Sequence, residues 1–231
     1  MIENPPLLTV RRTVDRASRE VLRSFEGVPT TWIVDALEGR AALDAAIKPV
    51  LSGVSVADHV VGSALTCFCS GNDNLALAAA LGLVQPGDVL VVANEGFRGA
   101  AIAGDLICGM AKNRGAAALV TDGMVRDVGV LERVGLPVFA AGVTPNSCAR
   151  NGPGTIGLPV TIAGKRVESG DLIVGDRDGV VVVARADVAL VTERLVTIRQ
   201  LESELLAKVE GGQDHLPAMQ DLLASDRVRW V

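Results

Sequence analysis

Residues 89–127 read VLVVANEGFRGAAIAGDLICGMAKNRGAAALVTDGMVRD, and this stretch carries the alternation that sets the fold class. It begins with the strand-like run 89–93, passes through a helical pattern at 100–114, and returns to a strand-like run at 117–121. The same alternation continues on both sides, with strand-like runs at 60–68 and 138–140 and helical patterns at 74–83 and 128–134. Alternating strands and helices are typical of an α/β domain in which helices cover a sheet. We therefore predict an α/β fold.

The two ends of the chain have different residue patterns from the central stretch. Residues 1–45 read as helical, with charges between apolar positions at 13–25 and a capping sequence at 29–31 before a helix at 32–37. After Pro159, short β-rich pieces separated by turns predict hairpins in a compact β layer: 159–162, 165–168, 171–174 and 179–183. A long helix from about Asp187 to Val209 follows and ends at Gly211-Gly212. We predict one domain over 1–231, with helical extensions at 1–24 and 187–231.

Composition excludes several classes of protein. The chain of 231 residues has a formal net charge of −5 and scattered basic residues, which argues against a nucleic-acid partner. Its mean hydropathy is +0.37, but Gly, Pro, Asn or Ser interrupts every uncharged stretch before the roughly 18 apolar residues of a membrane span. The first residues lack the pattern of a signal peptide, so we expect no membrane association and a cytoplasmic protein. The surplus apolar surface is expected between subunits.

The cysteine and histidine content restricts any metal site. Four cysteines, at 67, 69, 108 and 148, are interpreted as small buried side chains in a reducing compartment. With only His59 and His215, a histidine-rich zinc site is nearly excluded. A metal would therefore need oxygen ligands.

Three charged residues could carry chemistry. Asp105 follows Gly104 and starts a helical pattern, and Arg126-Asp127 follows the strand-like run 117–121. These residues can meet at one end of the sheet, where α/β proteins place their sites. Asp127 offers oxygen ligands for Mg²⁺ or Mn²⁺, Asp105 could hold a water or relay a proton, and Arg126 could bind a planar carboxylate. The alternative is a surface ion pair of Arg126 with Asp127 and a solvated Asp105.

The spacing of these residues resembles a known family. Asp105, twenty intervening residues and then Arg126-Asp127 match the D-x20-R-D signature of 4-hydroxy-4-methyl-2-oxoglutarate aldolases. The surrounding motifs resemble the wider RraA-like family over about residues 25–210, and they lie at 71–74, 85–92, 120–127, 135–139, 170–174 and 178–183. The resemblance implies an αββα sandwich with a compact central β layer and a long C-terminal helix. It also implies a homotrimer or homohexamer with sites between subunits.

The resemblance also assigns roles to residues. Asp127 would ligate Mg²⁺ or Mn²⁺, Asp105 would hold a metal-bound water, and Arg126 would bind the pyruvyl part of the substrate. Gly104, Leu106 and Ile107 would bind the substrate, with the backbone N–H groups of Leu106 and Ile107 contacting its carboxylate. A glutamate from the C-terminal helix of the neighbouring subunit would complete the site; Glu202 is favoured over the other two candidates, Glu193 and Glu204.

The implied reaction is the retro-aldol cleavage of a 4-hydroxy-2-oxo acid to pyruvate by a class II, metal-dependent lyase. Oxaloacetate decarboxylation uses the same enolate and is expected as a second activity. Two alternatives stay open: a non-catalytic RraA-like regulator of ribonuclease activity that acts by protein contact, and another 2-oxo acid reaction on the same scaffold. The groups that recognise the far end of the substrate are expected in the loops 72–74 and 94–98.

Other signals are weaker. Lys112 and Lys165 lack the setting of a Schiff-base lysine and are interpreted as surface residues. The sequence GPGTIG at 152–157 formally fits a dinucleotide loop, but no clear strand precedes it and Pro159 interrupts any following helix. We interpret it as a glycine-rich loop. Asp176-x-Asp178-Gly179 is interpreted as a β-turn, because the later acidic ligands of a calcium loop are missing.

Overall fold

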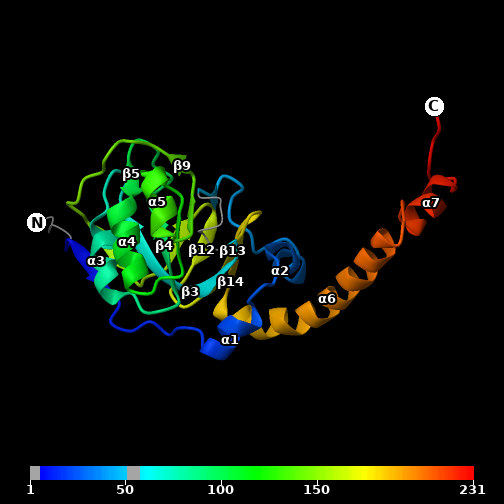
Figure 1. The fold of residues 1–231 in the computed structure, drawn as a ribbon, viewed down its shortest axis with the longest axis horizontal. Coiled ribbons are helices and arrows are strands. Elements are labelled where there is room, and N and C mark those ends of the chain that lie inside the picture. The colour runs from blue at the N-terminus through cyan, green and yellow to red at the C-terminus, as the bar shows by residue number, and fades with distance from the viewer. Residues whose placement is uncertain (1–5, 51–57) are drawn as a thin grey trace, which may run out of the picture.

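A nine-stranded sheet forms the centre of the molecule in the computed structural model, which describes residues 6–50 and 58–231 (Figure 1). Four parallel strands lie at its middle, in the order β3 (Val60–Cys69), β4 (Asp88–Ala93), β6 (Ala118–Thr121) and β8 (Val138–Ala140). All six residues of β4 are buried, as expected of a strand covered on both faces. These strands confirm the predicted α/β class.

The edges of the sheet come from shorter strands. On one side β10 (Gly154–Ile156) pairs with β3, and β1 (Leu8–Val10) pairs with β10; on the other side β2 (Lys48–Pro49) pairs with β8. The hairpin of β13 (Leu172–Asp176) and β14 (Gly179–Val183) adds to the far half of β3. The predicted compact β layer is therefore divided. Of these predicted hairpin strands, β11 (Val160–Ile162) and β12 (Lys165–Val167) form a sheet of their own, while β13 and β14 belong to the main sheet.

Helices cover one face of the parallel strands. They are α3 (Leu75–Ala80), α4 (Asp105–Asn113) and α5 (Val128–Val134), and they bury Leu77, Cys108 and Leu131 in one apolar cluster with the strands. The β11–β12 hairpin contributes Val160, Ile162 and Val167 to a second cluster, which includes Val89 and Val91 of β4. Alternate residues of β4 thus enter different apolar clusters, as the two faces of a strand require.

The remaining helices lie at the β13–β14 end of the sheet. Helices α1 (Arg19–Ser24) and α2 (Thr30–Ala36) precede β3, and the long helix α6 (Val188–Glu210) follows β14. A third apolar cluster joins residues of α2, β13, β14 and α6. Beyond Leu195, α6 projects away from the domain and leads to α7 (Pro217–Leu223) (Figure 1). The predicted long C-terminal helix is confirmed.

Two helical predictions were wrong in part. Within the described residues 6–45, the predicted helical segment contains α1, where Ser18 accepts a hydrogen bond from the Val21 amide, and α2, but residues 8–10 pair with β10 as β1. The helix predicted to begin at Ala100 begins at Asp105, because residues 101–103 form the strand β5. In both cases a strand partner distant in sequence overrides the local helical pattern.

A small parallel sheet of three strands lies beside the ends of the main strands, and no pattern in the sequence predicted it. It contains β5 (Ala101–Ala103), β7 (Met124–Val125) and β9 (Gly142–Val143) in that order. These strands follow β4, β6 and β8 in the chain, so the small sheet gathers the segments that leave three neighbouring strands. No helix in the described part of the chain is long and apolar enough to cross a membrane.

Candidate active site

The pairing of β5 with β7 brings Asp105 next to Arg126 and Asp127. The parallel register aligns Ala103 with Val125, and the Arg126 amide donates a hydrogen bond to the Ala103 carbonyl at 3.1 Å. The residues that follow each strand, Gly104-Asp105 and Arg126-Asp127, therefore lie side by side. A β-carbon on Gly104 would be 2.5 Å from Oδ2 of Asp127, so the carboxylate lies directly against the glycine.

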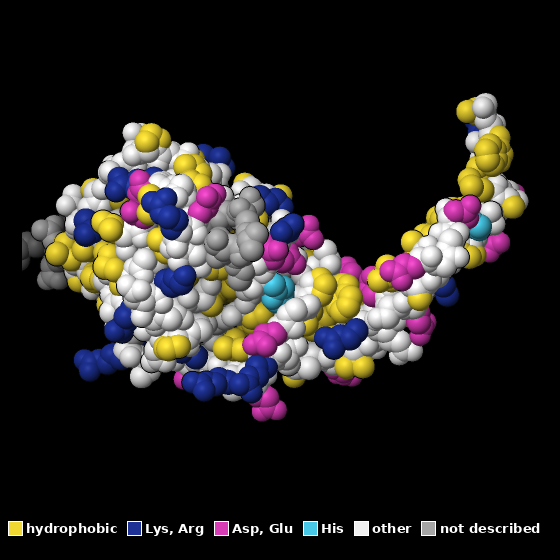
Figure 2. Space-filling model, viewed as in Figure 1, with side chains coloured by type: hydrophobic (Ala, Val, Ile, Leu, Met, Phe, Trp, Pro, Cys, Tyr) yellow, Lys and Arg dark blue, Asp and Glu magenta, His cyan; other side chains and the backbone are white. Residues whose placement is uncertain are grey.

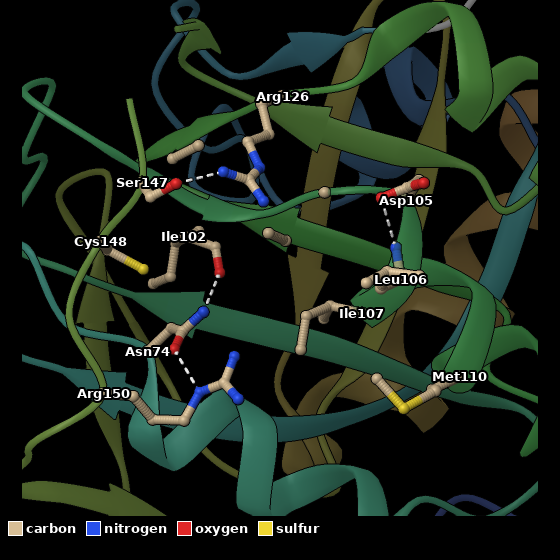
Figure 3. Close-up of a pocket in the computed structure, with 13 residues that line it drawn as sticks. Asn74, Ile102, Asp105, Leu106, Ile107, Met110, Arg126, Ser147, Cys148 and Arg150 are labelled. Carbon is tan, nitrogen blue, oxygen red and sulfur yellow. Dashed lines mark hydrogen bonds between the residues drawn. The ribbon is translucent and has the colours of Figure 1, made fainter. Parts of the chain in front are cut away.

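Arg126 and Asp127 form an ion pair at this position. Nε of Arg126 lies 3.1 Å from Oδ2 of Asp127, and the two side chains are 38% and 37% exposed. Nη1 of Arg126 donates to the Ser147 hydroxyl (Figure 3). Asp127 precedes α5 in a left-handed conformation, with φ of 62°, which is uncommon outside glycine and is often found at functional sites. The ion pair of Arg126 with Asp127, which the sequence left open as the alternative to a catalytic role, is present, and Arg126 also lines a cavity.

Asp105 is the first residue of α4. Its Oδ1 accepts a hydrogen bond from the Leu106 amide at 2.8 Å, while the Gly104 carbonyl accepts the Cys108 amide at 3.0 Å and starts the helix. The first turn of a helix carries unpaired N–H groups and a positive potential. Asp105, Leu106 and Ile107 all line the cavity, so this positive end of the nine-residue helix faces it.

The cavity has a volume of about 340 Å³ and lies between α4, β5 and the loop after β9 (Figure 3). Of the site residues predicted from the sequence, Gly104, Asp105, Leu106, Ile107 and Arg126 line it, whereas Asp127 is not among the lining residues. Four further residues complete the polar part of the wall: Asn74, Ser147, Cys148 and Arg150. Asn74 lies in a loop expected to contact the substrate. The loop 146–150 gave no sequence signal, because its residues meet the others through pairings between distant segments, such as Ala101 with Ser147 and Asp73 with Ala149.

The buried carboxylate of Asp122 holds the loop after β4 by hydrogen bonds. Asp122 follows β6, and its carboxylate accepts the Asn94 amide at 2.8 Å and the Gly96 amide at 3.2 Å. Burial raises the pKa of Asp122, and these amide hydrogen bonds oppose the shift.

Burial also raises the pKa of the Cys69 and Cys108 thiols to about 12. These two cysteines are structural, as the sequence suggested.

Glu202 is not near the cavity within one chain. It lies on the projecting part of α6, where it is exposed, and the helix runs away from α4 and α5 (Figure 1). Glu193 and Glu204 are exposed on the same helix. Completion of the site by one of these glutamates therefore requires a second subunit.

A divalent metal fits the donor chemistry of the site. Across residues 6–50 and 58–231, no group of three or more His, Cys, Asp and Glu side chains could hold an ion by protein ligands alone. Mg²⁺ retains several waters and binds through one or two carboxylates. Asp127, whose carboxylate packs on Gly104, and Asp105, the next residue after that glycine, supply hard oxygen donors. The carboxylate character of this pair also fits Mg²⁺ or Mn²⁺ better than zinc.

Comparison with known proteins adds an independent finding. The family model described as "RraA-like: Aldolase/RraA" matches residues 30–182, a range that contains the sheet from β2 to β13, nearly all of β14 and the whole cavity. This chain belongs to the RraA-like family. The match includes Asp105, Arg126 and Asp127 and ends before α6.

Relatives of this RraA-like chain carry different names. A protein of Halalkalibacterium halodurans named "Putative 4-hydroxy-4-methyl-2-oxoglutarate aldolase" is 39% identical over 172 residues, which is 74% of this chain and 80% of the relative. The solved structure of Streptomyces coelicolor RraAS2, described as an unusual member of the RNase ES inhibitor RraA protein family, is 28% identical with a TM-score of 0.74, over 84% of this chain and all of that one.

A third comparison agrees in fold. An uncharacterized protein from Pseudomonas syringae is 26% identical with a TM-score of 0.74, and the match covers 86% of this chain and 96% of that chain. The RraA-like family therefore includes relatives named for an aldolase and relatives named for ribonuclease inhibition. The choice between these two functions for this chain rests on the chemistry of its site residues.

Proposed function

We propose that this RraA-like protein is a divalent-metal-dependent lyase that cleaves a 4-hydroxy-2-oxo acid of the 4-hydroxy-4-methyl-2-oxoglutarate type by a retro-aldol reaction. The observation that carries the proposal is the packing of Arg126 and Asp127 against Gly104, where Gly104, Asp105 and Arg126 line one cavity. A surface that only contacts another protein does not require two carboxylates and an arginine to be clustered beside one glycine. The name of the Halalkalibacterium relative agrees with this function.

Asp127 would hold Mg²⁺ or Mn²⁺ directly, and Asp105 would contribute through water. When bound, such an ion acts as a Lewis acid that stabilises negative charge developing on the 2-oxo oxygen. The Gly104 position supports this assignment, because a side chain there would occupy the space of the Asp127 carboxylate.

The protein groups would bind the substrate at its 2-oxo acid end. Nε and Nη1 of Arg126 bond to Asp127 and Ser147, which fixes the guanidinium plane and directs the remaining nitrogen, Nη2, to an oxygen of the substrate. The amide of Ile107, in the first turn of α4, would donate to the substrate carboxylate, and the Leu106 amide would do so once it leaves Oδ1 of Asp105. Binding at both places orients the C3–C4 bond of the substrate for cleavage.

The reaction needs one proton removed and one returned. Loss of the 4-hydroxyl proton lets the C3–C4 bond break, so that C4 becomes a carbonyl carbon and the bonding electrons pass into the C2–C3 enolate. Protonation at C3 then yields pyruvate. Asp105 is the candidate group for moving these protons, because its carboxylate lines the cavity beside Arg126. Oxaloacetate would lose CO₂ to give the same enolate.

Assembly into a homotrimer or homohexamer is part of the proposal. Glu202 of a neighbouring subunit would complete the site, because α6 carries it away from its own cavity.

Pyruvate release tests the proposed function. The purified protein is incubated with 4-hydroxy-4-methyl-2-oxoglutarate, and separately with oxaloacetate, in Mg²⁺ or in EDTA. We expect magnesium-dependent pyruvate from the first substrate at a rate well above the protein-free control. Absence of release from a folded, magnesium-supplied protein would refute the lyase and favour the protein-binding alternative.

A further inference from the structure

A second guanidinium faces the same cavity. Arg150 lies on the loop between β9 and β10, and Figure 3 shows it across the cavity from Arg126, on the side formed by Asn74. Neither the spacing of the sequence motifs nor the proposed handling of the 2-oxo acid end uses this residue. An arginine at the far wall of a substrate cavity is a candidate for recognising the other end of the substrate.

The side chain of Arg150 is held in place by a buried amide. Nε of Arg150 donates to Oδ1 of Asn74 at 3.1 Å, and Nδ2 of Asn74 donates to the Ile102 carbonyl at 3.0 Å. Asn74 is only 7% exposed, and its backbone amide donates to the Ala149 carbonyl at 3.0 Å. Both the side chain and the loop of Arg150 are therefore fixed to the start of α3. The Nη groups remain on the cavity side of the guanidinium (Figure 3).

Arg126 and Arg150 differ in whether an ion pair with a carboxylate neutralises the guanidinium charge. Arg126 is paired with Asp127 at 3.1 Å, whereas the ion pairs within the described residues do not include Arg150. A guanidinium forks onto a carboxylate through two parallel N–H groups, and Arg150 still has its terminal nitrogens for this geometry. The cavity thus presents a guanidinium at each end, with apolar wall from Ile102 and Ile107 between them.

We propose that Arg150 binds the distal carboxylate of the substrate and makes the site selective for dicarboxylic over monocarboxylic 2-oxo acids. Asn74 is its positioning residue. The inference rests on the proposed function for the orientation of the substrate, with the 2-oxo acid end at Arg126 and the second carboxylate at Arg150. A cavity of about 340 Å³ has room for a five-carbon dicarboxylate between them.

A binding measurement tests Arg150 without requiring catalysis. Calorimetric titration in Mg²⁺ compares 2-oxoglutarate with 2-oxopentanoate, in which a methyl group replaces the terminal carboxylate. We expect the wild type to bind 2-oxoglutarate about 10- to 100-fold more tightly, as expected for a charge-assisted pair. Arg150→Met should remove most of this preference, and Arg150→Lys should restore part of it. Arg166→Met, an exposed arginine on β12 outside the cavity, is the matched control and should retain the full preference.

Kinetics separates this inference from the proposed function. With 4-hydroxy-4-methyl-2-oxoglutarate and its monocarboxylic analogue 4-hydroxy-4-methyl-2-oxopentanoate, Arg150→Met should raise KM for the dicarboxylate far more than it lowers kcat. A wild type that cleaves neither compound but shows the Arg150-dependent binding preference would refute the lyase and support the carboxylate site. An unchanged preference in a folded Arg150→Met, or no preference in the wild type, would overturn the role of Arg150.

Discussion

A β-carbon at Gly104 would lie 2.5 Å from Oδ2 of Asp127 and 3.0 Å from Cγ of Arg126, so the smallest residue is required where the two site segments meet. The backbone of Gly104 is extended, with φ of −149°, and any residue can adopt it. The requirement for glycine at this position therefore comes from the site and not from the conformation of the chain. A substitution here should affect activity much more than stability.

Gly104→Ala should displace Asp127 and Arg126 while leaving the fold intact. Because a misplacement of about 1 Å in a catalytic group can cost about 100-fold in rate, we expect kcat/KM for pyruvate release to fall by about 10- to 100-fold. Thermal unfolding followed by circular dichroism should change little, because the displaced atoms belong to half-exposed side chains. Unchanged kcat/KM would show that the Asp127 carboxylate is not needed at this place.

Asp127→Ala tests the metal assignment at the same point. Removal of this carboxylate should lower magnesium-dependent turnover by at least about 100-fold, because a bound metal contributes several kcal/mol to stabilising the enolate. Circular dichroism should show a folded protein, since the side chain is partly exposed and bonds mainly to Arg126. Full activity in this variant would remove Asp127 from the proposed site.

The raised pKa of Asp122 predicts that the free energy of unfolding depends on pH. Burial raises its pKa in the folded state above the ordinary value of 3.8, so the folded protein binds the Asp122 proton more tightly than the unfolded chain does. The contribution of Asp122 to the free energy of unfolding is therefore fully present below pH 3.8 and declines as pH rises through the raised pKa. Urea unfolding across this range should show the wild type losing stability relative to Asp122→Asn. A constant difference between the two proteins would contradict the shift.

Among the elements, the strand pair β5–β7 explains the spacing of the site residues. The twenty residues between Asp105 and Arg126 contain the rest of α4, β6 and β7, so the chain leaves the site, crosses the sheet and returns one strand further on. Parallel pairing then places the ends of β5 and β7 together. The distance in sequence is thus the length of one crossover between parallel strands.

Alanine substitutions at Gly62 and Gly109 should change the free energy of unfolding in opposite directions, because only Gly62 is closely packed. A β-carbon on Gly62 of β3 would lie 2.5 Å from the Gly87 carbonyl oxygen and 2.8 Å from Val89, whereas one on Gly109 of α4 would meet nothing within 4 Å. Gly62→Ala should lower the free energy of unfolding by about 1–3 kcal/mol through overpacking. Gly109→Ala should raise it by about 0.5–1 kcal/mol, because alanine loses less entropy in a helix. Denaturant titration measures both, and equal effects would contradict the close packing of β3 at Gly62.

At the scale of the whole molecule, the most informative feature is the free-standing part of α6. Within the helix only Val191 and Leu195 are buried, while apolar side chains beyond them are exposed: Val196, Leu201, Leu205, Leu206 and Val209 (Figure 2). A helix of 23 residues gains most of its stability in water from packing against other surfaces. These side chains and Glu202 lie on the same projecting segment, which agrees with the proposed subunit interface.

Val196→Glu tests the coupling of assembly to activity. Val196 is 71% exposed in one chain, so a glutamate there is tolerated by the monomer but opposes an apolar subunit contact. We expect sedimentation to show a trimer or hexamer for the wild type and smaller species for Val196→Glu, with pyruvate release lost in parallel. Thr197→Glu, at the adjacent exposed position, is the control and should leave both unchanged. An active wild-type monomer would refute the intersubunit glutamate.

Local patterns predicted most elements correctly, and the misses share one cause. Buried strands such as β4 and β8 and the helix α5 have strong apolar patterns of their own. Short strands such as β1, β5 and β10 have only three residues each, and they exist because a partner from another part of the chain supplies their hydrogen bonds. The start of the helix predicted at Ala100 was wrong for this reason.

The linear chain was enough to predict the α/β class, the long C-terminal helix and the candidates Asp105, Arg126 and Asp127, because periodicity and motif spacing are properties of the sequence alone. The three-dimensional fold was needed to find that Asp127 packs on Gly104, that the loop 146–150 closes the cavity, and that Asn74 holds Arg150 opposite Arg126. These contacts join residues from separate strands and loops. No local pattern records them, because they depend on which strands pair and in which register.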